Sequence, residues 1–358
     1  MTTSSLPLTA VLEMTYRCNH VCLFCSCPWF AEKFAIEDEI GIDEWKAVID
    51  ELRSRNVCDM AFTGGEPLLK EGLFDIIRHA VGLGVSTHLL SNGRIMSDDV
   101  LQFCAEHKVQ LSMSLPGLAT FQEHTGSDTS PHDVLDWIRK SHEAGIATVA
   151  GITVTNRNLG ELFETMAEAL LAGADSILLN RFMPGGRGLQ HRDYELNREQ
   201  LTEMLDTAEE VLRTANRFGH VGTELPHCVL EPAKYKHLQV GTRCSAAVGF
   251  FVVDPSGYVR VCNHSEHRLL HWRELDQVVQ HPYWKRFTEK SFLPPHCLSC
   301  EHSFRCDGGC REAAHIVGGV LESLDPLLIL PVGTTPHPTF AGRTALLQTC
   351  TPTGQVTV

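Results

Sequence analysis

The chain has 358 residues, of which 43% are hydrophobic, and its 44 acidic and 30 basic side chains give a formal net charge of −14. This acidic balance argues against a nucleic-acid partner, because nucleic acids select a basic face. No apolar run reaches the length of a membrane span, and residues 1–7 lack the basic and apolar regions of a signal peptide. We therefore expect a globular cytoplasmic protein that makes no contact with a membrane.

Cysteine is unusually frequent, with fourteen residues in the chain. In a short secreted protein such a number would indicate disulfides. Here the cysteines gather in closely spaced groups within a long chain that lacks an export signal. Binding of a metal ion or an iron–sulfur cluster in a reducing compartment is therefore the better interpretation.

Residues 8–182 alternate short apolar runs with amphipathic stretches. The expected strands are 8–15, 57–63, 86–91, 109–114, 147–155 and 176–182. The expected helices are 42–54, 73–82, 98–106, 131–144, 159–171 and 198–217. This alternation predicts an α/β fold in which a parallel sheet has helices outside it, and six units predict a partial (β/α)6 barrel of the TIM type. Ligands of such folds gather at the carboxyl ends of the strands.

Cys18, Cys22 and Cys25 follow the first strand in the pattern C-x-x-x-C-x-x-C. Three thiolates on one tight loop can bind three corners of a [4Fe–4S] cluster, whose complete site normally has four cysteines. A zinc site is the alternative, because Cys22 and Cys25 form a C-x-x-C pair, with Cys27 and His20 nearby. The spacing favours the iron–sulfur cluster.

The segment Gly64-Gly65-Glu66-Pro67 follows the second strand. Its two glycines let a ligand approach the backbone closely, and Glu66 or a neighbouring carbonyl could accept a hydrogen bond from an ammonium group. A plain tight turn would also explain these residues. Placed after the C-x-x-x-C-x-x-C loop, the segment resembles the one that holds the amino group of S-adenosylmethionine (SAM) in the radical SAM enzymes.

This resemblance implies a [4Fe–4S] cluster on Cys18, Cys22 and Cys25 that binds SAM and cleaves it reductively to a 5′-deoxyadenosyl radical. The electron would come from a donor such as a flavodoxin or ferredoxin. The SAM contacts implied by the resemblance are Phe24, Gly64, Gly65, Glu66, Pro67, Ser91, Asn92, Ser112, Ser114, Thr155 and Asn156. Many relatives have S-x-D-G after the fourth strand, whereas this chain lacks the aspartate and has Ser114-Leu115-Pro116-Gly117.

A second cysteine-rich region begins at residue 243. Asp254-Pro255-Ser256-Gly257 between two β-rich runs predicts a hairpin that brings Cys244 and Cys262 together. A C-x-x-C-x-x-x-x-x-C-x-x-x-C run follows, formed by Cys297, Cys300, Cys306 and Cys310. The hairpin and this run together resemble the SPASM extension of radical SAM enzymes, which binds auxiliary iron–sulfur clusters. A zinc knuckle is the alternative interpretation.

The SPASM resemblance implies two sets of thiolates that hold one or two auxiliary clusters. The inner set is Cys244, Cys262 and Cys310, and the outer set is Cys297, Cys300 and Cys306. In many relatives a further outer cysteine follows an Asp-Pro pair, but this chain has Leu327 there. The outer set could recruit Asp307 or Cys350, take an external ligand or stay incomplete. The inner set could recruit Cys228 or bind substrate at an open iron.

These assignments divide the chain into four parts. Residues 1–217 form the barrel, 218–242 a linker, 243–328 a small cysteine-rich α+β SPASM domain, and 329–358 a poorly ordered tail. Arg181 lies at the end of the sixth strand and Arg187 in the segment after it, where either guanidinium could pair with a carboxylate of SAM or of the substrate.

The leading hypothesis for function is a radical SAM oxidoreductase that abstracts hydrogen from a ribosomally synthesised precursor peptide, leading to crosslinking, epimerisation or oxidation. Because the sequence begins at the first strand, we expect peptide recognition to require a separate protein or none. The alternatives are a radical SAM dehydrogenase or epimerase of a small molecule and, less favoured, a non-catalytic metal-binding scaffold. The polar candidates for acid–base chemistry are Glu123, His124, Asp128 and Tyr194. In an epimerase, the returning hydrogen atom would come from Cys27, Cys104 or Cys228.

Overall fold

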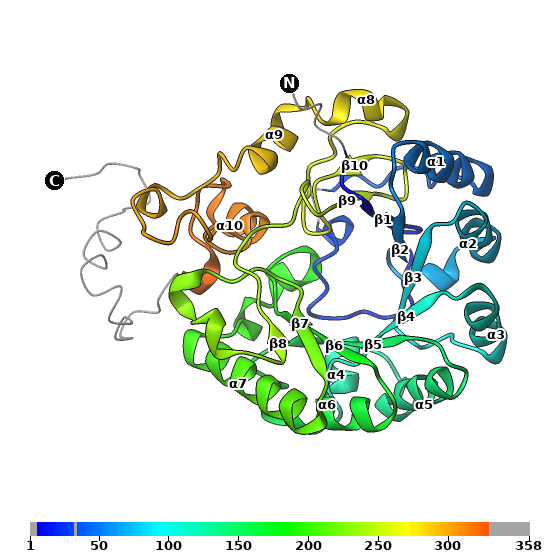
Figure 1. Cartoon of the computed structure of the whole chain (residues 1–358), viewed down its shortest axis with the longest axis horizontal. Helices are drawn as coiled ribbons and strands as arrows, with labels where there is room; N and C mark the ends of the chain where they lie inside the picture. Colours follow the sequence, from blue (N-terminus) through cyan, green and yellow to red (C-terminus); the bar gives the residue numbers. More distant parts are fainter. Residues whose placement is uncertain (1–5, 32–33, 329–358) are drawn as a thin grey trace.

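A computed structural model of the chain describes residues 6–31 and 34–328, and the expected tail at 329–358 lies outside these residues. The described part contains a ten-stranded sheet with the order β10-β9-β1-β2-β3-β4-β5-β6-β7-β8. The strands curve around an opening, and most of the helices form an arc outside them (Figure 1). The predicted α/β partial barrel is therefore confirmed.

The six predicted strands are present and lie next to one another in chain order within this sheet. They are β1 Thr9–Glu13, β2 Asp59–Thr63, β3 Ser86–Ser91, β4 Gln110–Ser114, β5 Thr148–Val154 and β6 Ser176–Arg181. Every pair from β1–β2 to β5–β6 is parallel. In β5, buried residues alternate with half-buried ones, as expected for a strand covered on both faces.

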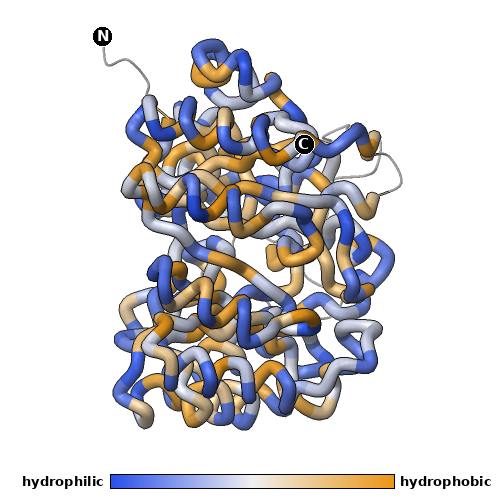
Figure 2. Tube along the Cα trace, turned by 90° about the vertical axis from the view of Figure 1, so that its right-hand side faces the viewer, coloured by the Kyte–Doolittle hydropathy of each residue, from blue (hydrophilic) through white to orange (hydrophobic). Residues whose placement is uncertain are grey.

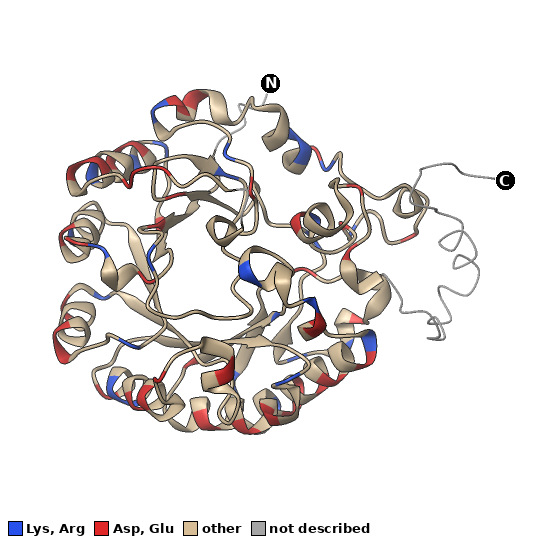
Figure 3. Cartoon of the chain, turned by 180° about the vertical axis from the view of Figure 1, so that it is seen from behind, with Lys and Arg blue, Asp and Glu red and all other residues tan. Residues whose placement is uncertain are grey.

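The helices of the barrel also lie where the sequence predicts them. They are α1 Ile42–Ser54, α2 Leu73–Gly82, α3 Asp98–His107, α5 Pro131–Glu143, α6 Leu162–Leu171 and α7 Arg198–Ala215, with an additional short α4 at Phe121–Thr125. Ser97, Ser130 and Asn197 cap three of them by accepting a backbone N–H with the side chain. Hydrophobic and hydrophilic residues alternate along these helices (Figure 2), and both signs of charge are interspersed on the outer helical ring (Figure 3).

Residues 218–242, the expected linker, contain two further strands. β7 Phe218–Val221 pairs in parallel with β6, and β8 Leu238–Gln239 pairs in parallel with β7. The segment therefore extends the barrel sheet. These strands have only four and two residues, which is too short for a recognisable alternation of polar and apolar residues. A contact with α7 fixes the position of β8, because the Glu209 carboxylate accepts the backbone N–H groups of Lys236, His237 and Leu238.

The predicted hairpin is present as β9 Phe250–Val253 and β10 Val259–Arg260, which pair antiparallel. Contrary to the expectation of a separate module, β9 also pairs in parallel with β1 and joins the barrel sheet. Phe251, Val252 and Val253 are fully buried there. The burial of this apolar strand against β1 explains why the hairpin continues the barrel.

The remaining helices connect the hairpin to the cysteine run and continue beyond it. They are α8 Leu275–Val278, α9 Pro282–Thr288 and α10 Arg311–Gly318. The short 3-10 helices are η1 Pro28–Phe30, η2 Pro67–Leu69, η3 Leu159–Glu161, η4 Gly186–Gln190, η5 Arg192–Tyr194, η6 His227–Val229, η7 Pro232–Lys234, η8 Trp272–Glu274, η9 Pro295–Cys297 and η10 Pro326–Leu328. In Figure 1, the segment with α10 lies between α9 and α7, at the open side of the helical arc.

Within the described ranges, no helix combines the length and the apolar character needed to cross a membrane.

Candidate active site and cluster sites

The loop that carries the first three cysteines is fixed by backbone hydrogen bonds to α4. The N–H of Val21 donates to the carbonyl of Thr125 at 2.9 Å, and the N–H of Leu23 donates to that of His124 at 3.0 Å. The loop begins directly after β1, so its cysteines lie at the carboxyl edge of the sheet. This is the edge at which barrel enzymes bind their ligands.

The surroundings of Cys18, Cys22 and Cys25 suit ligands of a metal cluster. Cys18 Sγ accepts hydrogen bonds from the N–H of His20 at 3.4 Å and from Nδ2 of Asn92 at 3.8 Å. Burial raises the pKa of Cys18 and of Cys22, and the neighbouring Cys25 raises both further. Such thiols become thiolates when a metal binds them. The three residues therefore fit the cluster that the sequence implies.

Cys27 lies directly beside this triad. Its thiol forms a hydrogen bond to Cys25, which lowers the pKa of Cys25 and raises that of Cys27 well above its usual value. Cys27 Sγ also lies 3.9 Å from the carbonyl oxygen of Gly64. These contacts place Cys27 within the same site.

The turn after β6 packs tightly against the cysteine loop. Gly186 has a φ of +50°, and a Cβ atom there would lie 2.4 Å from the carbonyl oxygen of Cys27. The N–H of Gly188 donates to the carbonyl of Cys25 at 3.2 Å. Arg187 stacks on Phe30, with 3.6 Å from its Cζ to the ring centroid. Only glycine fits at position 186, which brings the turn into contact with the loop.

The two arginines suggested as carboxylate partners have different surroundings. The positive charge of Arg187 acts on the three triad thiols, although burial outweighs it in raising the pKa of Cys18 and Cys22. Arg181 instead forms a buried ion pair with Asp325, 2.5 Å from Nη2 to Oδ2. This ion pair connects the cysteine-rich region to β6 and uses the guanidinium of Arg181 for that contact.

The Gly-Gly-Glu-Pro segment runs along the chain that enters the cysteine loop. The N–H of Gly65 donates to the carbonyl of Thr15, and the N–H of Glu66 donates to that of Arg17, both at 2.8 Å. A Cβ on Gly65 would lie 2.1 Å from the carbonyl oxygen of Arg17. Glycine is therefore required for this close approach, and Pro67 then begins η2.

The Glu66 side chain connects the loops after β2 and β3. Its carboxylate accepts the hydroxyl of Ser91 at 2.9 Å, the N–H of Asn92 at 2.8 Å and the N–H of Leu68 at 3.2 Å. Burial raises the pKa of Glu66 to about 7, although these hydrogen bonds oppose the shift. Asn92 in turn donates from Nδ2 to Oδ1 of Asn19 at 2.7 Å. The carboxylate thus supports the cysteine loop through Asn92.

The other SAM contacts implied by the sequence are less closely grouped. Thr155 Oγ1 lies 2.9 Å from His124 Nε2, and Asn156 donates from Nδ2 to the carbonyl of Asp193 at 2.6 Å. The Asn156 Oδ1 atom is buried without a hydrogen-bond donor, so it remains available to a ligand. The Phe24 ring lies 6.0 Å from that of His124. Ser114 lines the central cavity described next, whereas Ser112 is not among its lining residues.

A central cavity of about 490 Å³ joins the cysteine loop to the inner auxiliary set. Phe24, Cys25 and Cys27 line one side of it, and its walls include the ends of β2, β4 and β6 at Thr63, Ser114 and Asn180. The inner cysteines that line it are Cys244, Cys262 and Cys310. The volume lies in the usual range for small-molecule sites.

The three inner cysteines lie close enough for their thiols to interact electrostatically, and burial raises the pKa of each. Glu224 and Glu312 also act on these thiols and line the same cavity, as does His264. Glu312 Oε1 accepts the hydroxyl of Tyr283 at 2.8 Å, whereas its Oε2 makes no hydrogen bond and lies 3.5 Å from Nδ1 of His315. The sequence analysis did not single out these two carboxylates. The only signal for Glu312 is its position two residues after Cys310.

The polar residues suggested for acid–base chemistry lie outside the lining of this cavity. Tyr194 donates its hydroxyl to Glu123 Oε1 at 3.1 Å, and Asp128 pairs with Arg94 at 2.8 Å. His124 bonds to Thr155, as described above. These contacts give the four residues roles in holding loops together.

The outer cysteines surround a second cavity, of about 760 Å³. Cys297 and Cys300 line it together with Cys228, and the thiol of Cys228 lies close enough to Cys297 and Cys306 to interact electrostatically. The expectation that Cys228 reaches the inner set is therefore corrected, because its segment folds against the outer cysteines. Cys300 Sγ accepts the N–H of His302 at 3.5 Å, and Cys306 Sγ accepts that of Gly308 at 3.3 Å.

Across residues 6–31 and 34–328, the structure contains no group of three or more histidine, cysteine, aspartate or glutamate side chains arranged to hold a single metal ion.

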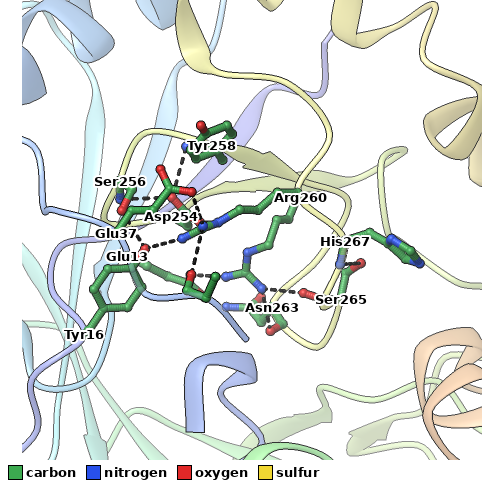
Figure 4. A network of polar contacts seen from close by, with 12 residues as sticks. Glu13, Tyr16, Glu37, Asp254, Ser256, Tyr258, Arg260, Asn263, Ser265 and His267 are labelled. Atoms are coloured by element: carbon green, nitrogen blue, oxygen red, sulfur yellow. Dashed lines mark hydrogen bonds and ion pairs between the residues drawn. The ribbon is translucent and has the colours of Figure 1, made fainter. Parts of the chain in front are cut away.

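A buried polar network joins the hairpin to β1 (Figure 4). Arg260 on β10 forms an ion pair with Glu13 on β1, and the Glu13 and Arg260 side chains are 2% and 0% exposed. Arg260 also donates to the carbonyl of Ser265 at 2.7 Å. Next to this pair, Asp254 accepts from Arg268 at 2.6 Å, and Tyr16 bonds to Ser256 at 2.8 Å. The network holds the Cys262 loop against the strand that leads to Cys18.

Residues 12–170 match the family described as the Radical SAM superfamily. The PqqA peptide cyclase of Granulibacter bethesdensis is 25% identical over 344 residues, which cover 92% of this chain and 89% of that protein. The PqqA peptide cyclase of Rhodopseudomonas palustris is 26% identical over 345 residues, which cover 92% of this chain and 88% of that protein.

Two solved structures share the fold over most of the chain. Streptococcus suis SuiB, bound to its precursor peptide SuiA, has a TM-score of 0.72 at 17% identity and covers 91% of this chain and 76% of that one. A histidine-tagged form of anSMEcpe with bound AdoMet has a TM-score of 0.69 at 18% identity and covers 90% of both chains. These likenesses extend beyond the barrel into the cysteine-rich region.

Proposed function

Because the chain is a radical SAM enzyme related to the PqqA peptide cyclases, SuiB and anSMEcpe, we propose that it removes hydrogen from a residue of a ribosomally synthesised precursor peptide. The names of the relatives support a peptide substrate, since they include peptide cyclases and an enzyme bound to a precursor peptide. The product would be a crosslinked, epimerised or oxidised peptide.

The observation that carries the proposal is the central cavity shared by Cys25 and the inner cysteines. Cys18, Cys22 and Cys25 would hold the cluster that binds SAM, and the inner and outer cysteines would hold auxiliary clusters. When bound, these clusters supply the electron that cleaves SAM to a 5′-deoxyadenosyl radical and accept one electron from the substrate. A substrate residue in the cavity would lie between the cluster that binds SAM and the inner auxiliary cluster.

The chain's own residues would position the reactants. The loops after β2 and β3, joined by Glu66, would bind SAM at the carboxyl edge of the sheet through Gly64, Gly65 and Asn92. Phe24 would lie against the adenine. A substrate that fills the cavity would displace water from the reacting carbon, which protects a radical from side reactions.

Glu312 is suited to accept the proton that a two-electron oxidation releases. The substrate loses one hydrogen atom to the adenosyl radical, one electron to an auxiliary cluster and one proton, which together amount to two hydrogens. Glu312 lines the cavity, and its Oε2 atom makes no hydrogen bond, although it lies 3.5 Å from Nδ1 of His315. A carboxylate with an available oxygen can take such a proton directly.

The test uses anaerobically reconstituted protein with SAM, dithionite and short precursor peptides encoded beside its gene. Mass spectrometry of the peptide should show a product whose formation requires SAM, together with 5′-deoxyadenosine. A variant with Cys18, Cys22 and Cys25 all changed to alanine should form neither. If the intact enzyme forms 5′-deoxyadenosine with a small molecule but modifies no peptide, the proposal is wrong in its substrate class.

Oxidation or epimerisation of a small molecule is the second candidate, favoured by the size of the central cavity, which lies in the usual range for small molecules. Epimerisation also needs a hydrogen-atom donor. Of Cys27, Cys104 and Cys228, only Cys27 lines this cavity. Epimerisation in deuterated water should therefore place deuterium in the product through the thiol of Cys27, and Cys27→Ala should abolish that incorporation.

A further inference from the structure

The outer cavity brings together cysteines from two distant parts of the sequence. Cys228 comes from η6, which follows the added strand β7, and Cys297 and Cys300 come from the cysteine run. The fourth member, Cys306, contacts the same segment, because its Sγ accepts the backbone N–H of His227 at 3.3 Å. The four thiols therefore belong to one region of the structure.

The position of Cys228 is fixed from both sides. On one side, the Arg198 guanidinium of α7 donates to the carbonyl of Cys228 at 3.0 Å. On the other, Pro226 packs over Gly309, where a Cβ atom would lie 2.8 Å from the proline Cγ. Gly309 has a φ of +91°, so both its conformation and this contact favour glycine. Contacts on both sides thus hold the segment of Cys228 in place beside the outer cysteines.

Asp307, suggested from the sequence as a completing ligand, is engaged elsewhere. Asp307 Oδ2 accepts the N–H of Cys244 at 2.8 Å and the ammonium of Lys290 at 2.6 Å. Asp325 accepts the N–H of Cys310 at 2.7 Å and pairs with Arg181. Leu327, which stands after the Asp-Pro pair, is 8% exposed and packs in the apolar core. Cys350 lies outside the described residues.

We propose that Cys228 is the fourth thiolate ligand of the outer auxiliary cluster, together with Cys297, Cys300 and Cys306. The proposal rests on the proposed presence of an auxiliary cluster in this set. On binding, each thiol releases its proton to solvent and its sulfur bonds to one iron. With four thiolates the cluster has no open iron. The outer cluster then transfers electrons without binding substrate, and any open iron belongs to the inner set, whose cysteines line the central cavity.

The test is anaerobic reconstitution with ferrous iron and sulfide in a background where Cys18, Cys22 and Cys25 are alanine, so that only auxiliary clusters are counted. Cys228→Ala should lower bound iron by about one to four atoms per chain, and the electron paramagnetic resonance spectrum of the outer cluster should change or vanish. Cys300→Ala should give a comparable loss. Cys58→Ala is the matched control, because Cys58 is exposed and lies outside every cysteine set.

The outcomes distinguish the assignment of Cys228 as a ligand from the presence of the outer cluster. Full iron content and an unchanged spectrum in Cys228→Ala, with a loss in Cys300→Ala, would overturn the assignment of Cys228 and keep the outer cluster. Full iron content in both variants would overturn the outer cluster itself. Circular dichroism and retention of the inner cluster's signal show whether each variant is folded.

A second measurement needs no substitution. Iodoacetamide labelling, followed by peptide mass spectrometry, compares the reconstituted enzyme with the same protein after iron removal by a chelator. Cys228 should be protected from labelling in the reconstituted enzyme and should become reactive after iron removal, together with Cys297, Cys300 and Cys306. Cys58 should be labelled in both states. Labelling of Cys228 in the reconstituted enzyme, with the other three protected, would contradict the proposal.

Discussion

Glu13 on β1 and Arg260 on β10 form an ion pair that is almost completely buried, although the two residues lie 247 positions apart in the sequence. Arg260 also reaches the carbonyls of the loop that follows Cys262, with 3.2 Å to that of Asn263. The pair therefore couples two cysteine-bearing loops through one guanidinium.

Replacement of Arg260 by methionine should strongly destabilise the protein, because it leaves the Glu13 carboxylate buried without its partner. Loss of one partner of a buried pair typically costs about 3–5 kcal/mol. Urea unfolding of the reconstituted protein measures the change. The double variant Glu13→Gln with Arg260→Met should recover part of the loss. A double variant no more stable than Arg260→Met alone would show that the cost does not come from the unpaired charge.

Gly186→Ala should impair loading of the first cluster. A Cβ atom at this position meets the carbonyl oxygens of Cys27 at 2.4 Å and Cys25 at 2.8 Å, and the backbone has a positive φ. Both effects push the turn away from the cysteine loop. We expect less iron per chain and less 5′-deoxyadenosine than in the wild type. Gly160→Ala is the control, since a Cβ there meets no atom within 4 Å, and an equal loss in both variants would contradict the steric explanation.

The raised pKa of Glu66, about 7 because of burial, makes stability depend on pH. Between about pH 4.5 and 7 the folded state binds more protons than the unfolded state, so this contribution to stability is complete below pH 4.5 and is lost as the pH rises through 7. The shift corresponds to roughly 3 kcal/mol.

Glu66→Gln removes this titration, so its stability relative to the wild type should rise between about pH 4.5 and pH 7, on the order of 3 kcal/mol at most. Urea unfolding at several pH values measures the difference. Glu71→Gln, which removes an exposed carboxylate in the following turn, is the control for the loss of a charge. A difference between Glu66→Gln and the wild type that does not change with pH would exclude Glu66 as the titrating group.

Glu312→Gln should separate SAM cleavage from product formation. The amide keeps the shape of the side chain but cannot take a proton, so 5′-deoxyadenosine should still form while modified product falls by about 10²–10⁴-fold. Glu123→Gln, in the network with Tyr194 outside the cavity lining, should leave the ratio of product to 5′-deoxyadenosine unchanged. Equal ratios in the wild type and Glu312→Gln would remove Glu312 from the reaction.

Much of the barrel was predictable from the sequence, because each strand from β1 to β6 is bounded by turns and followed by an amphipathic helix. β7 and β8 were not, since strands of four and two residues carry no periodicity and depend on contacts with α7. The hairpin was predictable from Asp254-Pro255-Ser256-Gly257, but its pairing with β1 was not. That pairing joins Thr9–Leu12 to Phe250–Val253, which lie far apart in the sequence, and local patterns do not encode such contacts.

In the candidate site, too, some residues were predictable from the sequence and others were not. Close spacing along the chain grouped Cys18 with Cys22 and Cys25, and the structure keeps them on one loop. Cys228 and Glu312 lacked such a signal, because their neighbours in space come from other elements. The resemblance predicts Glu66 as a SAM contact, whereas its hydrogen bonds to Ser91 and Asn92 form only when β2 and β3 lie side by side.

The pairing of β9 with β1 has a consequence for electron tunnelling. The rate of tunnelling falls steeply with distance, so two redox centres on independently moving domains would exchange electrons at a fluctuating rate. Here the strand before the Cys18 loop and the hairpin before Cys262 are adjacent in one hydrogen-bonded sheet, with Thr9 opposite Phe250 and Leu12 opposite Val253. The shared sheet would hold the proposed clusters of the two loops at a fixed distance from each other.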